Sequence, residues 1–510
     1  MLAQIQPAPS PARPVTEPSR RLIVASNRGP FVHSFSDSGR IVRTAAAGGV
    51  GTALTAASHM APLVWLAAPA SDADRMLAIA DRAVPLGEAS VVRFVEVPEE
   101  AQRLSYEVFA NPVLWFAQHG LTSLLERDLL GPEVWRAWEH GYRRVNQVLA
   151  AAIIRQVDEE GSDSVMLHDY HLYLASRTVK ALRPAVTLQQ FVHIPWPAPH
   201  AWEALPPKMV SAMCRGLLGN DSLAFQTEES VEHFLATCSI YLRDEVDVKA
   251  ASGEVKRNGR TTTVWSNPIS VEVRALREEM ESSEAARYRA LLEVERASCE
   301  RLIVRVDRLD PSKDIAGGFR AYERLLEGRP EWRGKVRFLA FLVPSRTSIP
   351  EYASYAREVM SLVERINRRF GTPGWQPLRV FHEHNRLQAL AGLELYDVLL
   401  VNSVADGMNL VAKEGPVLNQ RDGVLVLSTS AGSYAELRRG AVGVPPGDEA
   451  ATSAALDLAL RMPAGERRAR AEELRACIER HQLADWLRLL LKDMTIRGYV
   501  RELSRAGSHG

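Results

Sequence analysis

Short apolar runs that stop abruptly at polar side chains constrain the fold of this chain more than any other feature. Continuous apolar runs of this length are typical of strands that are covered on both faces. Helical patterns lie between the runs, for example over residues 132–157, where large apolar side chains recur at helical spacing. Alternating strands and helices predict an α/β fold with parallel sheets. The predicted strands cover residues 22–25, 165–167, 191–192, 302–304 and 398–401.

Polar side chains follow each of these predicted strands. Open parallel sheets bind their ligands beyond the carboxyl ends of the strands, so residues placed there are candidates for a functional site. One polar residue after one strand means little, because every strand must end. Five clusters that include Arg, Asp, His and Lys favour a functional crevice. They are Ser26-Asn27-Arg28, His168-Asp169, His193, Arg305 with its neighbours up to Arg308, and Asp406.

The last of these clusters passes at once into a predicted helix, and this junction favours an anion. Unpaired backbone N–H groups and the positive end of the helix dipole stabilise a phosphate, and Gly407 lets the backbone approach it closely. Asp406 would then face hydroxyl groups of the ligand, and Glu414, two turns further on, would face a ribose. An ordinary strand-to-helix turn capped by an Asp would show the same residues.

A glycine-rich segment soon after the first strand has two interpretations. Gly48, Gly49 and Gly51 precede a predicted helix, which fits either a loop that closes over a diphosphate or sugar or a structural tight turn. The segment lacks the GxGxxG spacing and the acidic partner of a dinucleotide site. A nicotinamide or flavin cofactor is therefore not indicated.

Two cations flank a proline-containing turn after the fourth predicted strand. Arg308 and Lys313 would neutralise a departing diphosphate, since Arg forks two phosphate oxygens while Lys adds a point charge. A solvated charged loop would contain the same residues. Arg346, Tyr106 and Trp115 stand beside these segments, and the two aromatic residues either stack on a sugar or belong to the core.

Composition narrows the class of protein. A chain of 510 residues exceeds what one hydrophobic core usually serves, so two domains are expected. With 62 basic and 62 acidic residues, the chain has no net charge that would attract nucleic acid or an anionic membrane. No apolar run is long enough to span a membrane. Four scattered cysteines indicate neither zinc nor disulfides, which predicts reduced thiols in a cytoplasm. The proline-rich residues 1–20 predict a disordered leader, and residues 505–510 a frayed end.

Taken together, these segments resemble the trehalose-6-phosphate synthase family, whose members are retaining glycosyltransferases of the two-domain GT-B type. The resemblance runs from about residue 21 to the 480s, and its motifs follow the order of the family. They are Ser26-Asn-Arg-Gly-Pro30, Gly48-Gly49, Tyr106 with Asn111-Pro-Val-Leu-Trp115, His168-Asp-Tyr-His-Leu172, His193-Ile-Pro-Trp-Pro197, Phe225-Gln-Thr-Glu228, Asp307-Arg-Leu-Asp-Pro-Ser-Lys313 and Asp406-Gly-Met-Asn-Leu-Val-Ala-Lys-Glu414.

The resemblance implies an architecture of two Rossmann-like, doubly wound domains that face each other across a cleft. Residues 21–268 would form an N-terminal domain that binds the acceptor. Residues 269–480 would form a C-terminal domain that binds the nucleotide sugar. Within residues 481–510, a helix would pack back on the N-terminal domain.

The resemblance also assigns donor contacts residue by residue. Arg308 and Lys313 would bind the diphosphate, together with the backbone at Asn409 and Leu410, and Glu414 would hold the ribose. The remaining donor contacts would be His193 and Asp406 at the sugar, Gly407 and Met408 in the same loop, and Gly49 closing beneath the sugar.

On the acceptor side, Asp169 would bind the hydroxyl groups of the acceptor. Its 6-phosphate would be held by three residues, Arg28, Tyr170 and Arg346, and this side of the site would be lined by Tyr106 and Trp115. The residues implied to take part in catalysis are Arg308, Lys313, His193 and Asp169.

The implied activity is transfer of glucose, with retention of configuration, from GDP-, UDP- or ADP-glucose to glucose 6-phosphate. No cofactor or essential metal is expected. In the same-face mechanism attributed to the family, the leaving phosphate oxygen takes the proton of the acceptor, so no side chain needs to act as nucleophile. We expect a separate phosphatase to act on the product, because residues after the synthase region leave no room for a phosphatase domain. A homo-oligomer is compatible with the sequence.

Departures from the family pattern keep other functions open. Trp65 is followed by Leu66-Ala-Ala-Pro-Ala70 and not by Gly-Trp-Ser-Gly, so a tryptophan on the acceptor side is missing. Ala405 stands where Arg is common, and Ser270 where Gly is common. One alternative is a pseudo-glycosyltransferase that couples a nucleotide-activated cyclitol to an aminocyclitol phosphate. The other is a non-catalytic regulator that binds nucleotide sugars. The retained cations argue against this second alternative.

Overall fold

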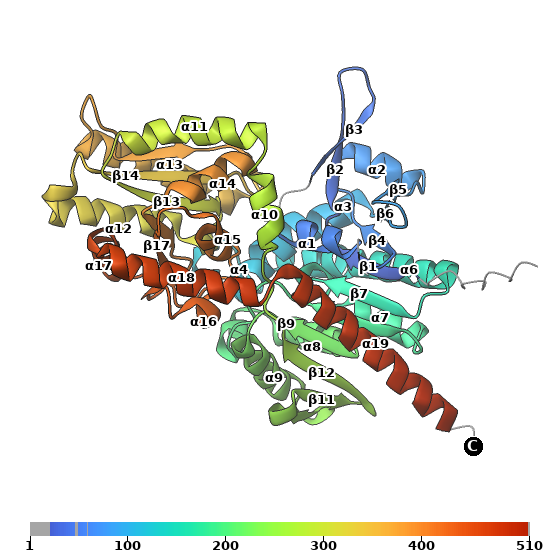
Figure 1. Cartoon of the computed structure of the whole chain (residues 1–510). Coiled ribbons are helices and arrows are strands. Elements are labelled where there is room, and N and C mark those ends of the chain that lie inside the picture. Colours follow the sequence, from blue (N-terminus) through green and yellow to red (C-terminus); the bar gives the residue numbers. More distant parts are fainter. Residues whose placement is uncertain (1–20, 46–48, 59, 508–510) are drawn as a thin grey trace, which may run out of the picture.

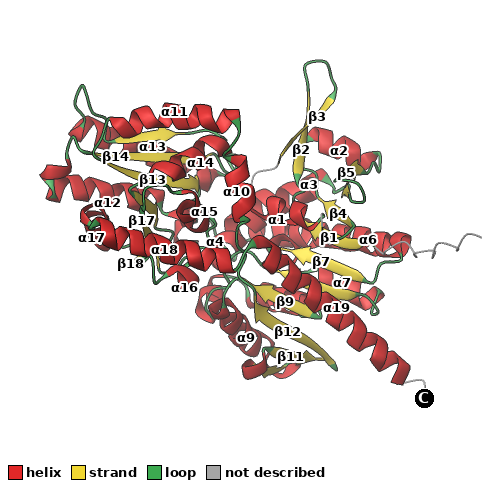
Figure 2. Ribbon diagram, viewed as in Figure 1, coloured by secondary structure: helices red, strands yellow, loops and turns green. Residues whose placement is uncertain are grey.

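The structure is a computed structural model that describes residues 21–45, 49–58 and 60–507. The predicted leader, residues 1–20, lies outside the described residues, as do the last three residues of the predicted frayed end. Two parallel-rich sheets account for the two halves of the chain (Figure 1). Helices lie over both faces of each sheet (Figure 2). In the described part of the chain, no helix is both long and apolar enough to cross a membrane.

The first sheet has the strand order β10-β11-β12-β9-β8-β7-β1-β4-β6-β5. Its central strands are parallel, and the order reverses direction between β1 and β7. The strands are β1 (Leu22–Ser26), β4 (Leu63–Ala67), β5 (Val84–Pro85), β6 (Val91–Phe94), β7 (Ser164–His168), β8 (Thr187–Phe191), β9 (Ser222–Phe225), β10 (Asp247–Lys249), β11 (Glu254–Arg257) and β12 (Arg260–Ser266).

The second sheet is parallel throughout, with the order β15-β14-β13-β16-β17-β18. This is the order of a doubly wound nucleotide-binding sheet, and its switch point lies between β13 and β16. The predicted α/β class is thus confirmed. The strands are β13 (Arg301–Arg308), β14 (Val336–Val343), β15 (Leu378–Phe381), β16 (Val398–Val401), β17 (Val424–Ser428) and β18 (Val442–Val444).

Both faces of the second sheet are buried, as the continuous apolar runs predicted. Along β16, Leu399 and Val401 belong to one hydrophobic cluster, while Val398 and Leu400 belong to another on the opposite face. The helices of this half are α10 (Val273–Glu279), α11 (Ser283–Ala297), α12 (Ile315–Gly328), α13 (Pro350–Phe370), α14 (Arg386–Leu395), α15 (Val411–Leu418), α16 (Tyr434–Leu437), α17 (Glu449–Arg461) and α18 (Ala464–Arg480).

The helical pattern predicted over residues 132–157 is not one regular helix. It divides into α5 (Pro132–Arg136), a π-helical turn η3 (Ala137–Tyr142) and α6 (Arg143–Glu160). A second π-helical segment, η1 (Leu104–Leu114), packs against it so closely that a Cβ on Gly141 would lie 2.6 Å from the backbone nitrogen of Ser105. Widened helical turns of this kind are common at functional sites, and η1 contains Tyr106 and Asn111.

The remaining helices cover the first sheet. They are α1 (Gly49–Ala57), α2 (Asp72–Ile79), α3 (Glu99–Arg103), α4 (Trp115–Gln118), α7 (Ala175–Leu182), α8 (Pro207–Leu217) and α9 (Glu228–Leu242). Gly49 begins α1 and does not precede it, which corrects the prediction of a loop at Gly49 and Gly51, whereas Gly48 lies outside the described residues. A hairpin of β2 (Phe31–Phe35) and β3 (Ile41–Ala45), which the sequence did not predict, projects from this half (Figure 1).

The chain crosses between the two halves twice. The first crossing, residues 267–272, is called the hinge below. The second follows α18, and from there α19 (Leu483–Gly507) runs across the first sheet (Figure 1). Gln189 on β8 donates to the carbonyl oxygen of Leu490 at 3.1 Å, and the ring of Trp486 is fully buried beside Phe191. The last helix is therefore part of the packing of the first sheet.

Candidate functional site

The switch points of the two sheets meet at the interface between the two halves. Arg346, which follows β14, donates to the hydroxyl of Tyr170, which follows β7, at 3.1 Å. Gly407, after β16, approaches residues after β8 so closely that a Cβ on it would lie 1.9 Å from the carbonyl oxygen of His193. Only glycine permits this backbone approach. The structure thus brings the clusters at the strand ends together, as expected for doubly wound sheets.

On the donor side, Lys313 forms an ion pair with Asp406, which joins the segments after β13 and β16. Asn409 donates to the same carboxylate at 3.0 Å and accepts from the backbone N–H of Ala412 at 3.1 Å. Although burial raises the pKa of Asp406, Lys313 and Asn409 stabilise its carboxylate and hold the pKa below its ordinary value. Asp406 is therefore an anion that fixes a cation and the start of a helix.

The helix predicted to start directly after Gly407 begins only at Val411. Asn409 has a left-handed backbone with a φ of 73°, so the helical conformation does not extend back through this residue toward the strand. Its side chain caps the helix in place of Asp406. Met408 is buried in the apolar cluster that includes Trp486, so the loop also packs against the other half.

The strand before the two cations is longer than predicted. β13 runs to Arg308, so Arg305 lies inside the sheet, fully buried and paired with Asp307 at 2.8 Å. Arg305 also donates to the carbonyl oxygen of Lys313, which fixes the turn η8 (Pro311–Lys313). The side chain of Arg308 is 42% exposed and lies 3.8 Å from Asp310. The turn that contains Lys313 is thus held in place, and the side chain of Arg308 is accessible.

Glu414 lies on the first turns of α15, where it forms an ion pair with Arg386 at 3.3 Å. Arg386 is also bound by Glu279, at the end of α10. Arg386 was not predicted from the sequence, because it lies outside the recognised motifs.

Asp169 lies at the start of the acceptor side, directly after β7. Its φ is 70°, a backbone conformation that non-glycine residues adopt mainly at turns and functional sites. Its carboxylate accepts from the backbone N–H of His193 at 3.1 Å. Burial raises the pKa of Asp169 to about 6, against the influence of this hydrogen bond and of Arg346.

Arg346 is buried and already bound to several partners. It donates to Asp310 and to the hydroxyl of Tyr352, both at 2.8 Å, besides Tyr170. Its guanidinium lies 4.2 Å from the ring centre of Trp115. A phosphate would therefore meet an arginine whose orientation is fixed. Asp310 is a site residue that the sequence analysis assigned no role, although it lies in the recognised motif.

Arg28, two residues after β1, is exposed. It donates to the hydroxyl of Tyr106 and lies 5.3 Å from the centre of that ring. Ser26 donates to the backbone carbonyl of Arg28 at 2.7 Å and accepts from the indole of Trp65, which fixes the turn. The guanidinium is thus positioned through its backbone while its head group stays accessible.

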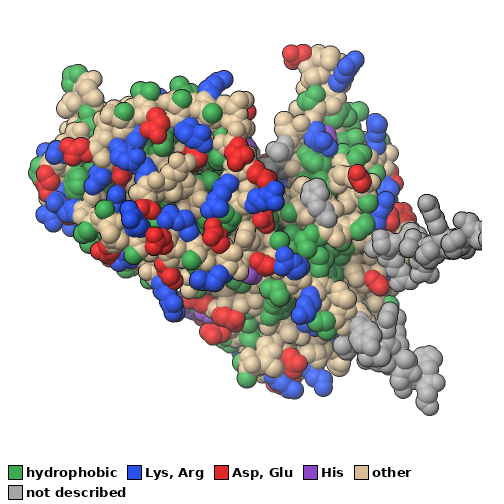
Figure 3. Space-filling model, viewed as in Figure 1, with side chains coloured by type: hydrophobic (Ala, Val, Ile, Leu, Met, Phe, Trp, Pro, Cys, Tyr) green, Lys and Arg blue, Asp and Glu red, His purple; other side chains and the backbone are tan. Residues whose placement is uncertain are grey.

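Most cations of the site are paired with carboxylates, whereas Arg28 and Arg308 are exposed enough to meet a ligand. Among residues 21–45, 49–58 and 60–507, no cluster of His, Cys, Asp or Glu side chains could hold a metal ion. Away from this interface, the face in Figure 3 shows acidic and basic side chains interspersed without a patch of one sign. The site therefore favours a small anionic ligand.

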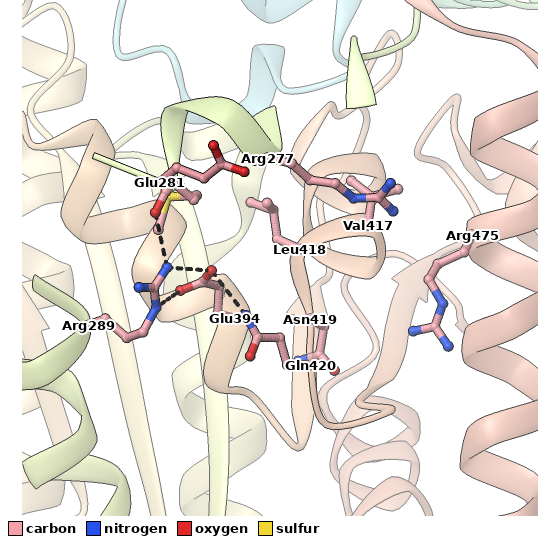
Figure 4. A pocket seen from close by; sticks show the side chains of 10 residues that line it. Arg277, Glu281, Arg289, Glu394, Val417, Leu418, Asn419, Gln420 and Arg475 are labelled. Carbon is pink, nitrogen blue, oxygen red and sulfur yellow. Dashed lines mark hydrogen bonds and ion pairs between the residues drawn. The ribbon is translucent and has the colours of Figure 1, made fainter. Parts of the chain in front are cut away.

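A separate hollow lies at the other end of α15 (Figure 4). Its floor is an ion pair between Arg289 and Glu394, with Gln420 donating to the same carboxylate. Arg277 and Arg475 on its wall pair with acidic residues outside the hollow. The strand-end residues described above do not reach this hollow, so it is distinct from the candidate site.

Known proteins resemble this chain over nearly its whole length. The model of Glycosyltransferase family 20 matches residues 20–496. An alpha,alpha-trehalose-phosphate synthase [UDP-forming] of Schizosaccharomyces pombe is 30% identical over 476 residues, which cover 92% of this chain and 89% of the relative.

Solved structures agree with both halves of the fold. An alpha,alpha-trehalose-phosphate synthase (UDP-forming) from Burkholderia xenovorans, in complex with glucose-6-phosphate, has a TM-score of 0.79 at 28% identity and covers 93% of this chain and 100% of the other. A protein from E. coli bound with UDP-2-fluoro glucose has a TM-score of 0.78 at 28% identity, covering 93% and 98%. The likeness confirms the predicted GT-B fold.

The raised pKa of Asp169 makes a prediction about stability. Its ionised form opposes folding, so the penalty is absent below its ordinary pKa of 3.8, grows as the pH rises, and is complete above about pH 6. Replacement Asp169→Asn should therefore stabilise the protein by about 3 kcal/mol above pH 6. The melting temperatures of wild type and Asp169→Asn, measured from pH 4 to pH 8, should differ more as the pH rises.

The control is Asp158→Asn, because Arg183 lowers the pKa of Asp158 and its ionised form does not oppose folding. This control should not gain stability above pH 6. If Asp169→Asn melts at or below the wild-type temperature at pH 7.5, Asp169 is not the desolvated carboxylate described here.

Proposed function

Because the chain belongs to glycosyltransferase family 20, in which it is a retaining glycosyltransferase of the trehalose-6-phosphate synthase family, we propose that it joins glucose to glucose 6-phosphate. The product would be α,α-trehalose 6-phosphate. The observation that carries this proposal is the meeting of two pairs of cations, Arg308 with Lys313 and Arg28 with Arg346, at the facing strand ends of two doubly wound sheets. Such an arrangement can bind the diphosphate of the donor and the phosphate of the acceptor at the same time.

The transfer follows from these positions. Arg308, Lys313 and the backbone N–H groups at the start of α15 stabilise the negative charge that develops on the departing diphosphate. The acceptor hydroxyl attacks from the same face and gives its proton to the leaving phosphate oxygen. Asp169 orients the acceptor through its hydroxyl groups, and Asp406 holds the donor sugar. Preorganised charges supply the stabilisation, because Lys313 is already fixed by Asp406.

For the donor we propose UDP-glucose. The residues alone leave the base open, and support comes from relatives: the S. pombe protein is called UDP-forming, and the E. coli structure contains UDP-2-fluoro glucose. For the acceptor, support comes from the B. xenovorans complex with glucose-6-phosphate. Glu414 at the start of α15 would bind the ribose, with Arg386 orienting its carboxylate.

Product analysis tests the proposal. Purified protein would receive UDP-, GDP- or ADP-glucose with glucose 6-phosphate, glucose or an aminocyclitol phosphate, with and without chelator. We expect transfer from UDP-glucose to glucose 6-phosphate, and NMR should show an α,α linkage in chelator as well. A β-linked product, or activity lost in chelator and restored by magnesium, would refute the mechanism. Preference for the aminocyclitol phosphate would favour the cyclitol-coupling alternative.

Replacement Arg308→Ala removes a donor that acts mainly as the diphosphate departs. Loss of one preorganised donor raises the barrier by about 3–4 kcal/mol, so kcat should fall roughly a hundred- to a thousandfold. Folding should be preserved, because the side chain is partly exposed. Steady-state kinetics would be compared with Arg324→Ala, an exposed arginine on α12, which should match wild type. Turnover of Arg308→Ala within a few fold of wild type would contradict the assignment.

Replacement Arg28→Ala tests the acceptor phosphate. A charge-assisted hydrogen bond contributes about 1.5–3 kcal/mol, so the KM for glucose 6-phosphate should rise roughly ten- to a hundredfold. The KM for the donor should barely change. Arg28 is the cleaner test, because removal of Arg346 would also leave the buried Asp310 without its closest cation. Arg28→Lys should recover part of the affinity. If both variants bind glucose 6-phosphate as wild type does, Arg28 does not contact the phosphate.

A further inference from the structure

Two residues of the recognised motifs, Gln226 and Lys413, have no role in the site described so far. Both are buried, and both bind the backbone of the same hinge residue, Ile269. The backbone N–H of Ile269 donates to Oε1 of Gln226 at 2.9 Å, and Nζ of Lys413 donates to the carbonyl oxygen of Ile269 at 2.9 Å. Gln226 follows β9 in the N-terminal half, and Lys413 lies on α15 in the C-terminal half. The backbone of Ile269 is thus held from both halves, through its N–H on one side and its carbonyl oxygen on the other.

Gln226 also determines which nitrogen of His193 carries the proton. A backbone N–H can only donate, so Oε1 of Gln226 must face Ile269 and its NH₂ group faces Nδ1 of His193 at 3.5 Å. Nδ1 is then an acceptor, and Nε2–H donates to Nδ1 of His168 at 3.1 Å. Burial lowers the pKa of both rings, that of His168 to about 3, so both are neutral.

Lys413 connects the same hinge residue to the donor side. Its side chain is 1% exposed, and its ammonium group also pairs with Glu436 at 2.6 Å. The next residue on the helix is Glu414, and the helix begins at the loop of Asp406 and Asn409. A shift of the Ile269 backbone would therefore displace both His193 and the helix that faces the diphosphate.

We propose that Gln226 and Lys413 are positioning residues, which fix the backbone of the hinge residue Ile269 and through it the orientation of His193 against the donor-binding end of α15. The proposal rests on the proposed function for its kinetic consequences but not for the hydrogen bonds themselves. Both residues act through others and touch no reacting atom. The hinge is then part of the donor site.

The sharpest variant is Gln226→Glu. It keeps an acceptor for the N–H of Ile269 but places a second carboxylate oxygen against Nδ1 of His193, so that a proton must lie between the two, shared by the carboxylate and the imidazole. We expect kcat to fall at least tenfold while the KM for UDP-glucose changes less than threefold. The acid limb of kcat should move to higher pH, because the carboxylate favours the imidazolium of His193. A merely structural glutamine would tolerate this isosteric change and leave the pH profile unmoved.

Lys413→Met tests the other half of the link, and Lys180→Met is its matched control. Lys180 is 3% exposed, donates to the carbonyl oxygen of Val186 and pairs with Asp221 at 2.6 Å, which is the same chemistry away from the hinge. Both variants should lower the melting temperature. Only Lys413→Met should lower kcat and raise the KM for UDP-glucose, each at least fivefold.

Hydrogen exchange provides a readout that does not depend on activity. The amide of Ile269 should be protected in wild type and should exchange at least tenfold faster in Gln226→Met, which cannot accept from it. If wild type transfers no glucose from any donor, the proposed function fails and the exchange data alone decide this inference. Equal exchange in wild type and Gln226→Met overturns it. It is equally overturned if an active enzyme keeps kcat and both KM values within twofold in Gln226→Glu and Lys413→Met.

Discussion

The ion pair between Lys313 and Asp406 holds together the two strand ends at which the C-terminal sheet reverses its order. Both groups are largely removed from water, so each needs the other, since an unpaired charge in this place would be strongly unfavourable. Asp406 in turn orients Asn409, which caps α15. The cation, the loop and the helix start are therefore in place before any ligand arrives. Preorganisation of this kind is what stabilises a departing diphosphate without further rearrangement.

Four non-glycine residues with a left-handed backbone lie around the same interface, and four others lie elsewhere in the described chain. Asp169, Asp314, Arg346 and Asn409 all have positive φ values between 49° and 73°. Each lies just after a strand or before a helix of the site, where the chain must turn within one or two residues. Such conformations persist only when surrounding contacts determine them. Here the contacts are the hydrogen bonds of Asp169 to the segment after β8, of Asn409 to Asp406, and of Arg346 to Asp310.

The sequence predicted the parts of the fold that depend on local pattern. Apolar runs located β1, β7, β13 and β16, because strands buried on both faces leave a continuous signal. The extension of β13 through Arg305 was not predicted, because an arginine in the sequence indicates the end of a buried strand. Arg305 can be buried because it is paired with Asp307. The π-helical turns depend on backbone packing at Gly141, which no local pattern reveals.

The site was predicted to a similar extent. Motifs placed the cations and carboxylates at the strand ends, and the structure brings most of them together. Their partners could not be predicted, because pairs such as Arg346 with Asp310, or Lys413 with the carbonyl of Ile269, join segments that are distant in sequence. Tertiary hydrogen bonds of this kind depend on the relative position of the two sheets. The assigned roles of individual residues remain predictions until variants are measured.

The double crossing of the chain has a mechanical consequence. The two crossing segments lie side by side, because His481 contacts the carbonyl oxygen of Pro268 at 3.0 Å and the N–H of Leu483 donates to Val271 at 3.2 Å. Two bonded segments resist sliding and twisting of one half against the other far more than a single linker does. Because α19 returns to the first sheet, the described chain also begins and ends on the same half, so a displacement of the other half would leave both ends of the described chain in place.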